Sequence, residues 1–178
     1  GAGMFGMFRV HDLNQSFLSG PFQQTGLIAQ VQSSMTQVRS LEKDMVILYE
    51  QPQRVEATHA QWQSSIDGVR AAANDLAKVA VPEDGVVVQK LLTHLTQYQE
   101  LFAPVAKQLI AGGYDSATVA QRVSARAVEQ FVQAEQQLNA LQQMLQAHAQ
   151  AAQLRGSQVE SQTQWLFILA LVITTVVV

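Results

Sequence analysis

The side chains best suited to bind an anion are Arg39, Arg122 and Arg126. The chain has only 11 Lys and Arg residues and a net charge of −3. A guanidinium group matches a carboxylate in a bidentate pair, so arginines gathered at one level of a protein favour a small organic anion. We therefore predict a site for a carboxylate or an amino acid, with Arg39 as its first cation and Arg122 or Arg126 as its second. Thr36 and Tyr98 are the expected hydrogen-bond partners.

The three arginines also have ordinary structural interpretations. Arg39 lies three residues before Glu42, a spacing that permits an ion pair along one helix. Arg122 and Arg126 lie away from the apolar line of their own segment, so they would reach either solvent or a partner subunit. The sequence leaves these alternatives open beside the anion site.

A tryptophan and a histidine share the inward line of the second predicted helix. Trp62 can be either a core residue or a surface on which a ligand stacks. His59, almost one turn earlier, can hydrogen-bond either a ligand or a buried backbone group. We include both as candidate ligand-binding residues.

Signatures of enzymes and of metal sites are absent from the sequence. There is no HExxH, no GxSxG and no glycine-rich phosphate-binding loop. Cys is absent, and the histidines are widely spaced: His11, His59, His94 and His148. The carboxylate pairs Glu42/Asp44 and Glu83/Asp84 are interpreted as solvated faces. We therefore expect no catalytic residue, metal or cofactor, and the few cations argue against a nucleic-acid partner.

Apolar residues that recur at steps of three and four predict four helices near residues 5–50, 53–80, 83–112 and 115–178. The breaks between them contain Pro52, Pro82 and the pair Gly112-Gly113, and Asp115 or Ser116 is the expected cap of the last helix. The apolar line predicted for the third helix consists of Val88, Leu91, Leu95, Tyr98, Phe102, Val105 and Leu109. The line predicted for the fourth helix consists of Val123, Val128, Phe131, Leu138, Leu141 and Leu145. The expected fold is an all-α, antiparallel, up-down-up-down four-helix bundle with two long outer helices.

The two ends of the chain suggest a membrane. Residues 165–178 are uncharged and begin with Trp165, as expected for the start of a truncated transmembrane helix. Residues 1–8 are either a tag remnant or the end of a first transmembrane helix, and residues 9–164 form the predicted four-helix-bundle domain. No Lys or Arg lies within eight residues before Trp165, which favours the non-cytoplasmic side for this domain.

In this bundle, several large or cationic side chains come to one level. At 1.5 Å per residue, the helical rise places them roughly 14–21 Å from the end of the bundle farthest from the membrane. They are Arg39, Trp62, Tyr98, Phe102 and Arg126.

The order of motifs resembles a known family. The chain contains Gly20-Pro21-Phe22, then the run from Val38 to Asp44, then Trp62, Tyr98-x-x-x-Phe102-x-x-Val105 and Gly112-Gly113. Over residues 8–165 it resembles the periplasmic four-helix-bundle ligand-binding domain of bacterial methyl-accepting chemotaxis receptors. The resemblance implies an inner-membrane receptor whose periplasmic domain binds a small anionic ligand and signals through the last helix. Arg39 matches an arginine commonly present on the first helix of that family.

The resemblance also implies a homodimer, and Ser33, Ser34, Ser40 and Ala127 are expected to be small surface residues that permit close helix approach. Two other functions remain open. The chain could be the sensor domain of a membrane histidine kinase, which shares this fold. It could also be a structural, membrane-anchored helical stalk, although a stalk would be expected to carry simple heptads throughout.

Overall fold

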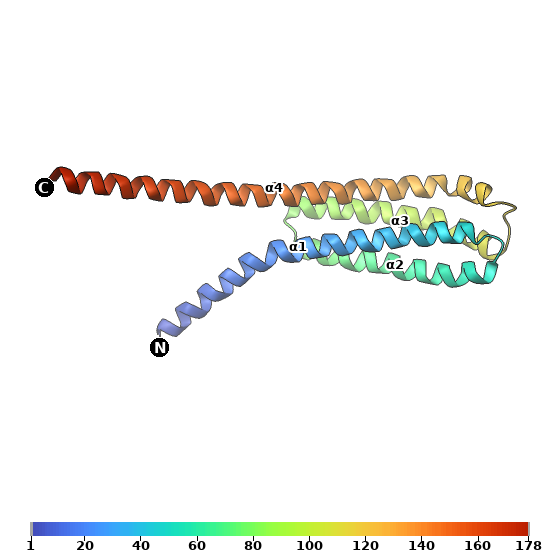
Figure 1. Cartoon of the computed structure of the whole chain (residues 1–178). Helices are drawn as coiled ribbons and strands as arrows, with labels where there is room; N and C mark the ends of the chain where they lie inside the picture. The colour runs from blue at the N-terminus through green and yellow to red at the C-terminus, as the bar shows by residue number, and fades with distance from the viewer. Residues whose placement is uncertain (1, 178) are drawn as a thin grey trace. The chain divides into compact units, whose positions relative to one another are not determined.

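The computed structural model describes the backbone of residues 2–177 and the side chains of residues 22–151. It contains four helices, α1 (Ala2–Ile47), α2 (Pro52–Val79), α3 (Pro82–Ile110) and α4 (Ala117–Val177), and no strand in the part of the chain so described (Figure 1). The predicted all-α class is confirmed, and the four helices are consistent with a helical bundle. Their ends lie within three residues of the predicted bounds.

The chain divides into two compact units, residues 1–142 and residues 143–178. All contacts described below lie within the first unit. The segments 1–8 and 165–178, for which a tag remnant and membrane helices are predicted, lie outside the residues whose side chains are described. Among the described residues, none of the helices is both long enough and apolar enough to span a bilayer.

The helix ends follow from local sequence. Pro52 and Pro82 occupy the first turns of α2 and α3, where their missing N–H group costs nothing. After α3, Gly112 adopts φ +69°, while the amide of Gly113 donates to the carbonyl of Gln108, which closes the helix in a glycine-dependent turn. The Ser116 hydroxyl accepts a hydrogen bond from the Val119 amide at 3.2 Å, which confirms the expected cap of α4.

The core is built from one apolar line on each helix. In α3 every predicted member of the line is buried: Val88, Leu91, Leu95, Tyr98, Phe102, Val105 and Leu109. The line predicted for α4 is partly wrong, since Val123 is 47% exposed. Small residues take its place, because alanine lets α4 approach its neighbours closely, and the buried line is Ala120, Ser124, Ala127, Phe131, Ala134, Leu138 and Leu141.

The small residues expected on the surface have three different degrees of burial. Ala127 is 1% exposed and therefore belongs to the core, so its predicted surface position is wrong. Ser34 is half-buried, and its hydroxyl oxygen lies 3.8 Å from the position of a Cβ atom built on Gly68 of α2. Ser33 and Ser40 are exposed.

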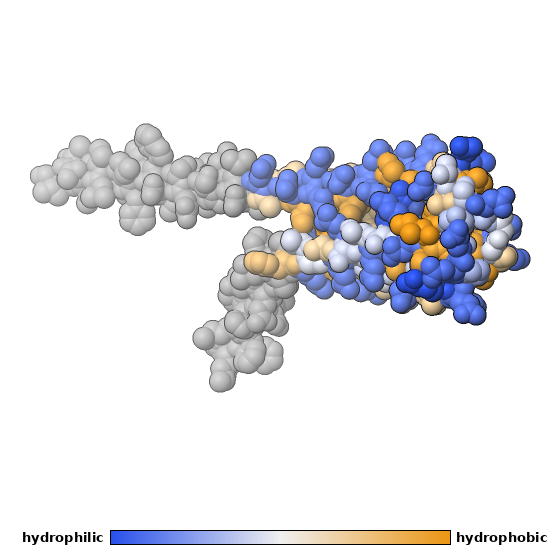
Figure 2. All heavy atoms as spheres, turned by 45° about the vertical axis from the view of Figure 1, so that its right-hand side comes forward, coloured by the Kyte–Doolittle hydropathy of each residue, from blue (hydrophilic) through white to orange (hydrophobic). Residues whose placement is uncertain are grey.

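Hydrophilic residues cover most of the face visible in Figure 2, and hydrophobic residues form separate groups on it. The most exposed large apolar side chains in the described part are Phe22 (79%), Ile47 (68%) and Val86 (57%). Isolated apolar side chains are common on protein surfaces and need no explanation. Ile47 differs because it borders a cavity, as described below.

Candidate functional site

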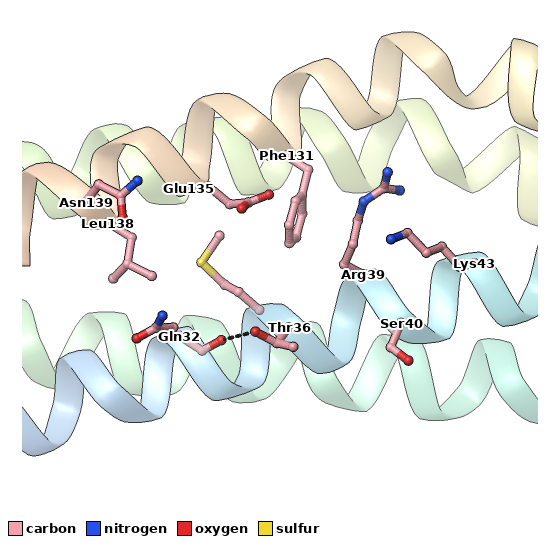
Figure 3. A pocket seen from close by; sticks show the side chains of 10 residues that line it. Gln32, Thr36, Arg39, Ser40, Lys43, Phe131, Glu135, Leu138 and Asn139 are labelled. Atoms are coloured by element: carbon pink, nitrogen blue, oxygen red, sulfur yellow. Dashed lines mark hydrogen bonds between the residues drawn. The ribbon is translucent and has the colours of Figure 1, made fainter.

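A cavity of about 370 Å³ lies between α1 and α4. Its apolar part is formed by the buried side chains of Met35, Phe131 and Leu138. Its polar part combines two cations, one carboxylate and several hydrogen-bonding groups: Arg39, Lys43, Glu135, Gln32, Thr36, Ser40 and Asn139. Figure 3 shows Arg39 extending from α1 towards α4, while Phe131 and Glu135 project from α4 into the space between the helices.

Arg39 forms an ion pair with Glu42, the structural alternative that its spacing permitted. The arginine side chain remains 27% exposed and lines the cavity, whereas the Glu42 side chain is only 4% exposed. The prediction that Glu42 lies on a solvated face is therefore wrong. A sequence signal for its burial existed, because Glu42 follows Val38 by four residues and precedes Met45 by three, and both are core residues.

The pair Glu83/Asp84 was also predicted to be solvated, and this is wrong for Asp84, which is 5% exposed. Asp84 lies in the first turn of α3, where the free amides and the helix dipole stabilise a carboxylate. Glu83 and Asp44 are exposed, as predicted.

A buried hydrogen-bonded chain connects Glu42 to the core. The Tyr98 hydroxyl donates to Glu42 Oε1 at 2.7 Å and accepts a hydrogen bond from Trp62 Nε1 at 3.0 Å. Both aromatic side chains are at most 1% exposed. Phe131 meets Tyr98 edge to face at 5.1 Å between ring centroids, and it also lines the cavity. The hydrogen bonds among Glu42, Tyr98 and Trp62 therefore join α1, α2 and α3, and the contact of Phe131 with Tyr98 adds α4.

Burial is the main cause of the pKa shifts in the hydrogen-bonded side chains and in His59 beside them. Removal from water raises the pKa of Glu42 from its ordinary value of 4.5, while the hydrogen bond from Tyr98 and the charges of Arg39 and Lys43 oppose that rise. Burial also raises the pKa of Tyr98, and the neighbouring Glu42 carboxylate raises it further. His59 stacks on Trp62 at 5.6 Å between ring centroids, and partial burial lowers its pKa.

The predicted site residues separate into three groups. Arg39 and Thr36 line the cavity, and the Thr36 hydroxyl donates to the Gln32 carbonyl at 3.0 Å. Tyr98 and Trp62 are in the core, with His59 half-buried beside them, and none of the three lines the cavity, although Tyr98 contacts Phe131, which does. Arg122 and Arg126 are exposed and line neither this cavity nor the adjoining one described below.

Several cavity residues were not anticipated. Lys43 lies one helical turn after Arg39, on the same side of α1, and this spacing could have identified it. Glu135 and Asn139 have the same spacing on α4. Their relation to α1 depends on how α4 is rotated about its axis, which the periodicity of a helix with many alanines leaves poorly defined.

In the described part of the chain, no three His, Asp or Glu side chains are grouped so that they could hold a metal ion. His94 instead makes a hydrogen bond between its Nδ1 atom and Gln130 Oε1 at 2.9 Å, which joins α3 to α4.

Comparisons with protein-family models, with curated proteins and with solved structures each found no match to the chain. The functional argument therefore depends on the residues and on the geometry of the cavity.

Proposed function

We propose that this chain is the extracytoplasmic ligand-binding domain of an inner-membrane receptor of the chemotaxis type. It binds a small organic anion, a carboxylate or an amino acid, in the cavity between α1 and α4. Binding there changes the relation of α4 to α1, and α4 carries the change towards the membrane. A ligand shifts such an equilibrium only if it binds one helix arrangement more tightly than another.

The observation that carries the proposal is the pairing of two cations, Arg39 and Lys43, at one cavity of about 370 Å³. This volume lies at the small end of the range for small-molecule sites. Only one carboxylate, that of Glu135, is among the lining residues. Arg39 is also paired with Glu42, which does not line this cavity, so an added anion would bind Lys43 together with the guanidinium N–H groups that Glu42 does not occupy. With an amino-acid ligand, Glu135 provides an acceptor for the ammonium group.

The proposal includes an antiparallel order of the helices. Gln24 Nε2 donates to the Val79 carbonyl at 2.9 Å, and Ser34 lies beside Gly68. Residue numbers therefore rise along α1 while they fall along α2, which supports opposite directions. Gln142 Nε2 donates to Gln32 Oε1 at 3.1 Å, whereas Ile47 lines a cavity together with Gln121, so residue numbers also rise along α1 while they fall along α4. The membrane attachment through residues 165–178 follows from their composition alone.

A purely structural stalk is a weaker explanation. A simple helical stalk would fill the seam between its helices with regular apolar side chains. Here the α1–α4 seam holds a cavity lined by both charged and apolar side chains, and beside it an ion pair whose carboxylate is buried.

Replacing Arg39 by alanine should weaken the binding of a carboxylate at least tenfold. Loss of a hydrogen bond to a charged group costs about 1.5–3 kcal/mol, and a tenfold change in affinity corresponds to about 1.4 kcal/mol. We would measure affinity by calorimetry on the full chain, after a thermal-shift screen of carboxylates and amino acids has selected a ligand.

Two further variants separate ligand binding from folding. Glu42→Gln removes the internal partner of Arg39 and leaves the guanidinium available, so anion affinity should be maintained or increased. Arg126→Ala removes an exposed arginine outside the cavity and should leave affinity unchanged. Unchanged affinity in Arg39→Ala, or an equal loss in Arg126→Ala, would contradict the assignment of the site.

We also propose that the receptor domain is a parallel homodimer. Exposed Ser33 and Ser40 on α1 permit the close approach of a second copy. Analytical ultracentrifugation of the full chain should detect a dimer whose population rises with protein concentration and with bound ligand. A chain that stays monomeric at high concentration, with and without ligand, would refute this arrangement.

A further inference from the structure

A second cavity, of about 430 Å³, adjoins the first between the same two helices. Arg39 and Lys43 line both cavities and therefore mark their common boundary. The remaining lining residues of the second cavity are Glu42, Val46, Ile47, Gln121, Ser124, Ala125 and Val128.

Beyond the two shared cations, the second cavity offers mainly apolar contact. Val46 is buried, Val128 is half-buried and Ile47 is 68% exposed at its edge. The polar groups at the back of the cavity already have partners. Ser124 donates its hydroxyl hydrogen to the Ala120 carbonyl at 2.6 Å, and Glu42 is paired with Arg39. An occupant of this cavity would therefore gain affinity chiefly by covering apolar surface.

We infer that the anion held at Arg39 and Lys43 is a monocarboxylate that carries a branched or aromatic apolar group, and that this group lies against Val46, Ile47 and Val128. The inference rests on the proposed anion site and adds the class of ligand. It also explains why a large apolar side chain, that of Ile47, is exposed next to two cations.

The distribution of charge disfavours a dicarboxylate. The lining of the second cavity contains no cation other than the shared pair, and its one carboxylate is that of Glu42. In the first cavity a second carboxylate would approach Glu135. One ligand carboxylate can bind Lys43 and the N–H groups of Arg39 that Glu42 does not occupy, whereas a second would meet either apolar surface or a like charge, and both are unfavourable.

The test is a calorimetric series on the full chain with acetate, butanoate, 4-methylpentanoate, phenylacetate and succinate. Burial of each additional methylene group should tighten binding about fourfold, so 4-methylpentanoate should bind at least tenfold more tightly than acetate. Succinate should bind no more tightly than acetate.

A variant and a matched control locate the apolar group. The double variant Ile47→Ser/Val128→Thr should reduce the advantage of 4-methylpentanoate over acetate to less than threefold. Val86→Ser/Val132→Thr makes equivalent changes at two valines that are 57% and 43% exposed and line neither cavity. The control should retain the full advantage.

The outcomes separate the two proposals. If carboxylates bind through Arg39 but chain length has no effect, or if succinate binds most tightly, the apolar class is wrong and the anion site stands. If the advantage of the longer chain survives in Ile47→Ser/Val128→Thr, the apolar group is placed in the wrong cavity. If no carboxylate or amino acid binds at all, the proposed function itself fails.

Discussion

Replacing Trp62 by alanine should lower the free energy of unfolding by about 3–5 kcal/mol, the usual cost of removing a large aromatic side chain from a core. Trp62 is 1% exposed, and its ring centroid lies 5.2 Å from that of Phe102 and 5.8 Å from that of Tyr98. Its indole N–H also donates a hydrogen bond to the Tyr98 hydroxyl oxygen. Urea denaturation followed by far-ultraviolet circular dichroism measures the change.

Two comparisons make this prediction specific. Trp62→Phe keeps most of the apolar ring and removes only the hydrogen-bond donor, so it should cost about 1–3 kcal/mol. Phe22→Ala removes an aromatic side chain that is 79% exposed, and it should change stability by less than about 0.5 kcal/mol. If Trp62→Ala were no more damaging than Phe22→Ala, Trp62 could not occupy the core.

The helices were predictable because burial repeats along each of them. In α3 the apolar spacing alone identified seven buried residues from Val88 to Leu109, although it omitted the buried Ala106. The prediction was weaker for α4, where alanines face the core and Val123 faces outwards. A prediction based on large apolar residues assigns the wrong angle about the helix axis to the buried face of such a helix, so the residues predicted to face its neighbours are also wrong.

The error in the buried face of α4 explains why the site residues of α1 were predicted better than those of α4. Arg39 could be placed at the edge of the core because the apolar line of α1 is well defined, and it does line the cavity. Arg126 was placed at the same level by counting residues, and both Arg122 and Arg126 were predicted to lie away from the apolar line of their helix, with solvent as one alternative to a ligand site. Both are exposed outside the cavity, while Glu135 of α4 lines it.

The burial of Glu42 was missed for a different reason. A carboxylate at a core position is rare, so its charge outweighed its spacing in the interpretation. What makes the position tolerable is visible only in three dimensions, where Arg39 and the Tyr98 hydroxyl each contact one carboxylate oxygen. A tyrosine 56 residues away in the chain cannot be assigned to this role from helical periodicity.

Stability should depend on pH through Glu42. Burial raises its pKa from 4.5, so the folded chain holds this proton more strongly than the unfolded chain does. Stability from this group should therefore fall as pH rises from 4.5 through the raised pKa, and become constant above it. The groups that face Glu42 are Arg39 and Lys43 of α1 and Tyr98 of α3, which contacts Trp62 of α2. The α4 residues lining the second cavity are uncharged.

Arg39→Ala should make this dependence steeper, because it removes a charge that holds the Glu42 pKa down. Below pH 4.5 the carboxyl group is protonated in either state and the variant should lose little stability, whereas near neutral pH the loss should reach about 1.5–3 kcal/mol. In a Glu42→Gln background the same arginine substitution should cost less than about 0.5 kcal/mol at any pH, since no buried charge remains to be stranded. Urea denaturation of the four chains between roughly pH 4 and 8 gives the coupling free energy at each pH. A coupling free energy near zero across this range would mean that Arg39 does not interact with the Glu42 carboxylate, and that Arg39 stabilises the bundle by packing alone.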